Sequence, residues 1–229
     1  MKKTLLALLI ATPIIANAGE VNILSSTMLN IPDSIKQDLQ KRKQEQDTKG
    51  YYETNSDYAG YLLNLKKVAP QEIKSFRSNP DAYDTHLKSD YKEIKLAFPF
   101  KIPNGVNPKD IVGYAAAGGY VKKAAENHPE GWTGIGTYFT SENIGSCGYS
   151  FFNLALTHGG VDLNNDFTTY RVNKKASTET IEGNHKQGFV YSLSWYTKDT
   201  MSKLECANLN FDKEIMNKMV ILANKIDKQ

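Results

Sequence analysis

The stretch GFVYSLSWYTKDTMSKLECANLNF, residues 188–211, decides the fold. Every second residue of its first half is large and apolar: Phe189, Tyr191, Leu193 and Trp195. This alternation has the period of a β-strand, so we expect a strand over residues 188–197. Residues 198–201 are turn-like, and residues 204–211 carry the chain back. The stretch therefore predicts an antiparallel hairpin.

The returning half of this hairpin contains a break in its apolar pattern. Leu204 and Cys206 are at even positions, whereas Leu209 and Phe211 are at odd positions. In a regular strand the two pairs would therefore point to opposite faces. An extra residue in a strand restores such a pattern, because it shifts every later side chain to the other face. We therefore expect a bulge near residues 207–208.

Downstream of the hairpin the sequence predicts a closing helix over residues 212–227. Asp212 and Glu214 suit the positive N-terminal end of a helix, and Lys225 and Lys228 suit its negative end. Four apolar residues at helical spacing form a stripe that would face the core: Ile215, Met219, Leu222 and Ile226.

Upstream of the hairpin, several shorter strands are expected, at residues 94–100, 111–120, 132–141, 149–157, 167–173 and 177–181. Residues 162–166 read as a turn. The connections are too short for parallel crossovers, so the strands should be mostly antiparallel. The fold class is therefore α+β, with a multi-stranded sheet over roughly residues 92–211 and helices at both ends.

The region before the sheet, residues 19–90, is polar and is expected to be helical. Pro32 suits a first helical turn, and Ile31, Ile35 and Leu39 form a short apolar stripe that fades after residue 40. Further helices are expected over residues 56–67, from Pro70 and over residues 81–88. Their narrow apolar faces should lie on something larger. We therefore expect residues 19–90 to form one folding unit with the β-rich domain, residues 91–229.

The first 18 residues have the three parts of a cleavable secretory signal peptide. Lys2 and Lys3 form a positive start, residues 5–15 are mainly apolar, and Ala16-Asn17-Ala18 is a small-x-small site. The apolar run is shorter than the ~20 residues that span a bilayer. We therefore expect cleavage between Ala18 and Gly19 and an exported protein, periplasmic or secreted, that is not an integral membrane protein. The short form with two leading lysines is typical of bacteria.

Charge gives no reason to expect a nucleic-acid partner. The whole chain has 28 basic and 25 acidic residues. Removal of Lys2 and Lys3 takes its net charge from +3 to +1. A nearly neutral protein lacks the basic surface that phosphate backbones and anionic membranes attract.

The chain has two cysteines, Cys147 and Cys206. An even pair in an exported protein indicates a disulfide. Closing a loop of that length would stabilise the fold by roughly 4 kcal/mol in the chain-entropy account. A catalytic cysteine needs a free thiolate, which an oxidising compartment disfavours.

The histidines offer one catalytic hypothesis. His158 follows an expected strand and precedes two glycines, and His185 lies in a turn with Glu182. If the fold brought His158, His185 and Glu182 together, they would make a general acid/base site. Nothing in their spacing requires this. No two histidines of the chain have the spacing of a helical metal pair.

No metal or cofactor motif is complete. Asp162, Asn164 and Asp166 alternate like the start of a calcium loop, but Phe167 stands where the loop needs glycine and Asn173 where it needs glutamate. The glycines of residues 113–119 match no phosphate-binding loop. No metal site and no cofactor is therefore expected.

Aromatic residues are plentiful, with 13 tyrosines and two tryptophans. Such side chains supply binding energy to protein and carbohydrate ligands at low entropic cost, but they are also favoured in the core of a β-sheet. The candidates for an exposed binding patch are Trp132, Tyr138, Tyr196, Tyr114 and Tyr120.

Three classes of function are compatible with these observations. The leading hypothesis is a non-catalytic binding or interaction protein of the periplasm or extracellular medium, with a protein or a carbohydrate as ligand. The first alternative is a hydrolase-type enzyme that uses His158 with a carboxylate partner. The second is a structural or envelope-associated protein.

Mass spectrometry of the intact exported protein tests cleavage and the bridge together. Without reduction, we expect a chain that begins at Gly19 and is two hydrogen atoms lighter than its reduced form. A mass that retains residues 1–18, or one that reduction leaves unchanged, would contradict the respective expectation.

Overall fold

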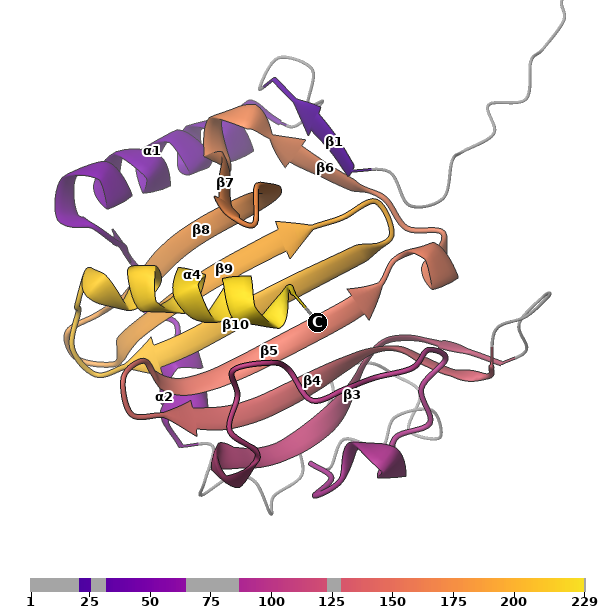
Figure 1. Cartoon of the computed structure of the whole chain (residues 1–229). Helices are drawn as coiled ribbons and strands as arrows, with labels where there is room; N and C mark the ends of the chain where they lie inside the picture. The colour runs from indigo at the N-terminus through magenta and orange to yellow at the C-terminus, as the bar shows by residue number, and fades with distance from the viewer. Residues whose placement is uncertain (1–20, 26–31, 65–86, 123–128, 229) are drawn as a thin grey trace, which may run out of the picture.

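A computed structural model describes residues 21–25, 32–64, 87–122 and 129–228 of the chain. Its centre is an eight-stranded sheet in the order β2-β8-β9-β10-β5-β4-β3, with β7 paired to β8. The strands are β2 (Tyr52–Glu53), β3 (Ile111–Val121), β4 (Gly131–Ser141), β5 (Gly145–Asn153), β7 (Thr168–Val172), β8 (Lys175–Asn184), β9 (Gly188–Tyr196) and β10 (Thr200–Asn208). Helices α1 (Asp33–Lys49), α2 (Tyr58–Leu63) and α4 (Glu214–Ile226) surround it (Figure 1). The α+β class is confirmed.

The sheet is antiparallel from β8 through to β3, as its short connections predict. The exceptions join distant parts of the chain. β2 pairs in parallel with β8, and β1 (Val21–Leu24) forms a separate parallel pair with β6 (Val161–Asn164). These short strands were not predicted, and two of them lie in the region expected to be helical. Of residues 162–166, expected as a turn, the first three belong to β6 and the last two begin the 3₁₀ turn η5 (Asn165–Phe167).

Helix α4 lies across the face of the sheet formed by β9 and its neighbours (Figure 1). The predicted stripe is buried: Ile215, Met219, Leu222 and Ile226 are all less than 9% exposed. They pack against the alternating residues of β9, of which Phe189, Tyr191 and Leu193 have no exposed surface. The hairpin pattern and the helical stripe therefore meet in one core.

The opposite face of the sheet is covered by α2. Ala59 and Leu62 of this helix pack on Val190 and Ala207, which have the other parity in β9 and β10. The Tyr58 hydroxyl donates to a carboxylate oxygen of Glu205 at 2.9 Å. Residues 65–67, also expected in this helix, lie outside the described residues, as do the helix expected from Pro70 and most of the helix expected over residues 81–88. The last two residues of that helix are described and are not helical, because Lys88 forms an isolated bridge with Tyr114.

The disulfide joins Cys147 of β5 to Cys206 of β10. The two residues face each other in register, with 4.1 Å between their Cα atoms, and both are fully buried. The predicted bridge is therefore present in the core under α4, and it is compatible with an exported protein. In the described part of the chain, no helix is long and apolar enough to cross a membrane.

The bulge predicted near residues 207–208 is wrong. Strand β10 runs without a register shift along both β9 and β5 and ends at Asn208. Leu209 lies beyond the strand and is 65% exposed, so its parity imposes nothing on the sheet. The next apolar residue, Phe211, packs its ring near Tyr51 and Phe189.

The strand expected over residues 94–100 is also wrong. This segment makes a single isolated bridge, between Leu96 and Trp132. Ile94 and Ala97 are both buried, although they have opposite parity in a strand. Pro99 has no N–H to donate to a ladder, which helps to explain why the chain stays irregular here. The expected strand over residues 149–157 likewise starts earlier, as β5, and ends before the 3₁₀ turn η4 (Ala155–Thr157).

Helix α1 forms where it was predicted, but its apolar stripe is not buried in a core. The helix has no buried residue, and Ile35 is 47% exposed. Ile31 lies outside the described residues. Leu39 is partly buried and faces a cleft between α1 and the edge of the sheet. The polar pattern after residue 40 correctly indicated a solvated helix.

Candidate functional site

The structure does not bring the three catalytic candidates together. His185 and Glu182 lie near the β8–β9 turn, whereas His158 follows η4 beside the β9–β10 turn, where the Leu154 N–H donates to Asp199 O at 2.8 Å. These turns are at opposite ends of β9, about 25 Å apart at the rise of a β-strand. His158 and His185 are exposed, and Glu182 accepts a hydrogen bond from the Tyr52 hydroxyl. The proposed acid/base group is therefore not assembled.

The aromatic candidates do not form an exposed patch. Tyr114, Trp132 and Tyr196 are at most 9% exposed, so the expectation that they lie on the surface is wrong for these three. Tyr120 and Tyr138 are partly buried. Tyr138 packs beside α2, and burial raises the pKa of its phenol above the usual range. The preference of aromatic residues for sheet cores accounts for their placement.

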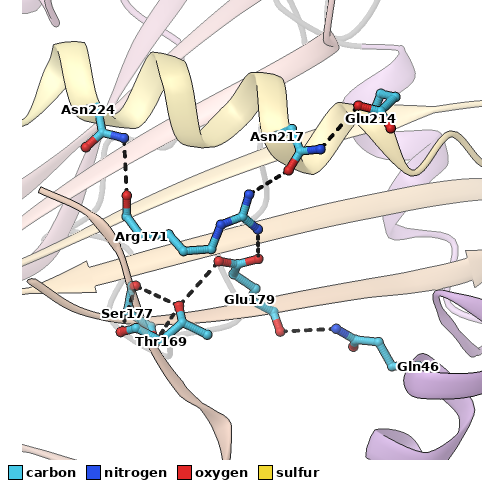
Figure 2. Close-up of polar contacts among 8 residues, drawn as sticks. All are labelled: Gln46, Thr169, Arg171, Ser177, Glu179, Glu214, Asn217 and Asn224. Carbon is cyan, nitrogen blue, oxygen red and sulfur yellow. Dashed lines mark hydrogen bonds and ion pairs between the residues drawn. The ribbon is translucent and has the colours of Figure 1, made fainter. Parts of the chain in front are cut away.

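A polar network ties α4 to the edge of the sheet (Figure 2). Arg171 of β7 donates to Glu179 of β8 at 2.8 Å and to the side-chain oxygen of Asn217 in α4 at 2.6 Å. Asn224, two turns further along α4, donates to the Arg171 carbonyl at 3.2 Å. On the other side, Gln46 of α1 donates to the Glu179 carbonyl at 3.5 Å. The network fixes the direction of α4 across β7 and β8.

The C-terminal end of α4 is held by a second contact, centred on Asp227. Its carboxylate accepts hydrogen bonds from Lys175 Nζ at 2.5 Å and from the Trp195 indole N–H at 3.0 Å. Asn173 Nδ2 donates to its other oxygen at 2.8 Å. The Asp227 side chain is only 8% exposed, so these three donors replace the water that its charge has lost.

Next to this contact lies a cavity of 370 Å³, here called the aromatic pocket. Its wall is built by an irregular segment, the three strands β5, β8 and β10, and the end of α4. The lining residues are Phe98, Pro99, Phe100, Lys101, Tyr149, Phe151, Lys175, Thr200, Ser202, Ile226 and Asp227. The rings of Phe98 and Phe151 lie 5.2 Å apart between centroids. The pocket therefore has aromatic walls from two parts of the chain that are distant in sequence.

Polar atoms gather at one part of the aromatic pocket. The Tyr149 hydroxyl and Ser202 Oγ form a hydrogen bond of 3.2 Å, and both side chains belong to buried residues. Burial is the main reason that the pKa of Tyr149 is raised to about 12, so the phenol stays protonated at neutral pH. Its ring stacks on Trp195 with 5.9 Å between centroids.

Two other cavities have more charged residues in their walls than the aromatic pocket has. The cleft between α1 and the sheet measures 400 Å³ and is lined by charged residues, among them Arg42, Asp166 and Glu182. A wider hollow of 860 Å³ lies at the β4–β5 turn and the start of α4. Sites for small molecules are mainly apolar, with a few convergent polar groups. The aromatic pocket differs from both in having four aromatic residues and the fewest charged residues in its wall, and we therefore take it as the candidate site.

Comparisons with known proteins give no relative: no family model, no curated protein and no solved structure matches the chain. In the described residues, no group of three or more His, Cys, Asp or Glu side chains is placed to hold a metal ion. We therefore base the proposal of function on the aromatic pocket.

Sequence reasoning missed the pocket because its wall comes from segments that are distant in the chain. The alternation of Phe98 and Phe100 was visible, but it was interpreted as part of a strand over residues 94–100. Asp227 and Lys175 are unremarkable in sequence, since nothing local marks them as a pair. The available signal was a cluster of aromatic residues beside Pro99, in a segment that proline keeps out of the sheet.

Removal of the Asp227 carboxylate should destabilise the fold. Asp227→Ala leaves Lys175 and the Trp195 indole without their acceptor, and we expect the free energy of unfolding to fall by about 2 kcal/mol. Urea denaturation measures it. The matched control is Asp47→Ala, which removes an exposed ion pair with Lys43 and should cost at most ~0.5 kcal/mol. Equal losses in the two variants would contradict this account of Asp227.

Proposed function

We propose that this chain is an exported, non-catalytic binding protein that holds a small, mainly apolar ligand in the aromatic pocket. The observation that carries the proposal is the pocket itself. Phe98, Phe100 and Phe151 are each partly exposed and line one cavity together with the buried Tyr149. Its volume of 370 Å³ lies in the range of pockets that enclose small molecules.

The chemistry of the wall supports binding rather than catalysis. Its ionised pair, Lys175 and Asp227, is engaged in the contact that holds α4 to the sheet. The Tyr149 phenol is protonated at neutral pH and so cannot accept a proton, and its raised pKa makes it a weaker acid than an ordinary phenol. Among the described residues, no histidine lines the pocket. These groups are suited to hold and orient a ligand.

Export is supported by two independent features. Residues 1–18 carry the pattern of a cleavable signal, with its cleavage site between Ala18 and Gly19, and they lie outside the described residues. The Cys147–Cys206 disulfide suits an oxidising compartment. A bacterial periplasm or the surrounding medium would supply such a compartment.

The hydrolase alternative has less support. Among the described residues, His158 makes no side-chain hydrogen bond or ion pair. It follows η4 with a left-handed backbone, at φ 51°, which is typical of a residue that ends a turn. An acid/base role needs a partner within hydrogen-bond reach, and none is contributed by the residues around this turn.

A fluorescence titration tests the proposal. The probe is 6-propionyl-2-(dimethylamino)naphthalene, an uncharged aromatic ketone whose emission depends on its surroundings. We expect saturable binding by the purified, disulfide-bonded protein. Phe98→Ser should weaken it roughly tenfold or more, because the probe loses an aromatic wall.

The matched control for this titration is Phe167→Ser. Phe167 is also partly exposed, and it lines the cleft under α1 instead of the aromatic pocket. This variant should bind the probe like the unmodified protein. Absence of saturable binding, or equal weakening in both variants, would overturn the proposal.

A further inference from the structure

We infer that the ligand of the aromatic pocket is an uncharged aromatic molecule with a hydrogen-bond acceptor, such as a carbonyl oxygen, that accepts from the Tyr149–Ser202 hydroxyl pair. This inference rests on the proposed function and adds the chemical class of the ligand.

The hydroxyl pair has one donor to spare. Tyr149 and Ser202 each carry one O–H, and the single hydrogen bond between them uses one of the two. Either oxygen can be the donor in that bond, so the free O–H can be presented by the tyrosine or by the serine. Both residues are at most 6% exposed and line the pocket. A ligand oxygen at this point would satisfy a buried donor, which contributes both affinity and orientation.

Two of the three charged residues in the lining cancel each other. Lys175 and Asp227 form an ion pair at 2.5 Å, and the Asp227 side chain is nearly buried. The carbonyl end of α4 adds partial negative charge beside them. Lys101, the other cation of the lining, is exposed to solvent. An ionised ligand would lose its hydration at the hydroxyl pair, and the exposed Lys101 would offset little of this cost because water screens its charge, so the pocket favours a neutral ligand.

The aromatic side chains favour a ring. The ring centroids of Phe98 and Phe151 lie 5.2 Å apart, with an angle of 46° between the rings, so the two rings contact each other and form one aromatic wall of the cavity. Aromatic pairs gain energy in offset and edge-on arrangements at such distances. A ring in the cavity would meet Phe98 or Phe151 while its acceptor reaches the hydroxyl pair.

Three competitors that share a naphthalene ring separate these features: 2-acetonaphthone has a carbonyl, 2-ethylnaphthalene lacks an acceptor, and 2-naphthoate is charged. Each is titrated against the bound ketone probe. In the double variant Tyr149→Phe/Ser202→Ala, the ring of Tyr149 is kept and both hydroxyls are lost. We expect 2-acetonaphthone to bind this variant roughly fivefold more weakly, because one hydrogen bond is lost.

The other arms of the experiment test specificity. In the same variant, 2-ethylnaphthalene should keep its affinity within about twofold, because it makes no hydrogen bond. The emission of the bound ketone probe should shift to shorter wavelength. With the unmodified protein, 2-naphthoate should compete roughly tenfold more weakly than 2-acetonaphthone, because its charge must be desolvated.

The control variant is Tyr191→Phe. It removes a phenol hydroxyl from a buried tyrosine on the same face of the sheet, outside the aromatic pocket. It should leave the binding of all three competitors unchanged, although its Asp212 contact is lost.

The outcomes distinguish the two proposals. The inference on ligand class fails, and the binding function stands, if the probe binds in a Phe98-dependent way but the double variant weakens 2-acetonaphthone and 2-ethylnaphthalene equally. It also fails if 2-naphthoate competes as well as 2-acetonaphthone. If the unmodified protein binds neither the probe nor any competitor, the proposed function fails and the ligand class fails with it.

Discussion

The packing of α4 against β9 and β10 is the contact on which the rest of this structure depends. It joins the two parts of the chain with the clearest periodicity, the strand pattern around Tyr191 and the helical pattern around Met219, which are both fully buried. The disulfide lies beneath the same helix. Without α4 the apolar face of the hairpin would lie in water, where apolar surface is unfavourable.

The direction of α4 is fixed by polar contacts at its side and its end. Arg171 and Asn217 link the helix to β7, while Asp227 links its last residues to Lys175 and Trp195 (Figure 2 shows the first of these). Apolar packing alone is not directional, so such contacts give a helix one orientation among several of similar energy. The orientation leaves part of the sheet face uncovered by the helix. Residues 94–106 cross that part, and the aromatic pocket lies between them and α4.

Local patterns predicted much of the fold. The alternation through Leu193, the stripe through Leu222 and the even number of cysteines each correspond to a feature of the structure. The short parallel strands β1 and β2 were missed because two to four residues have too little periodicity to be recognised, and their partners are more than a hundred residues away. The aromatic pocket was missed for the same reason of distance. Aromatic residues such as Tyr196 and Trp132 are equally typical of a sheet core and of a binding surface. Only their burial in the structure shows that these two belong to the core.

The central claim is that a ligand occupies the space between residues 98–101 and the end of α4. Hydrogen–deuterium exchange, with and without the saturating ketone probe, tests it most directly. The account predicts slower exchange in residues 98–103 and 223–228, and unchanged exchange in α1, which lines a different cleft. Slower exchange confined to α1 and β8, or no change in either segment beside the aromatic pocket, would contradict it.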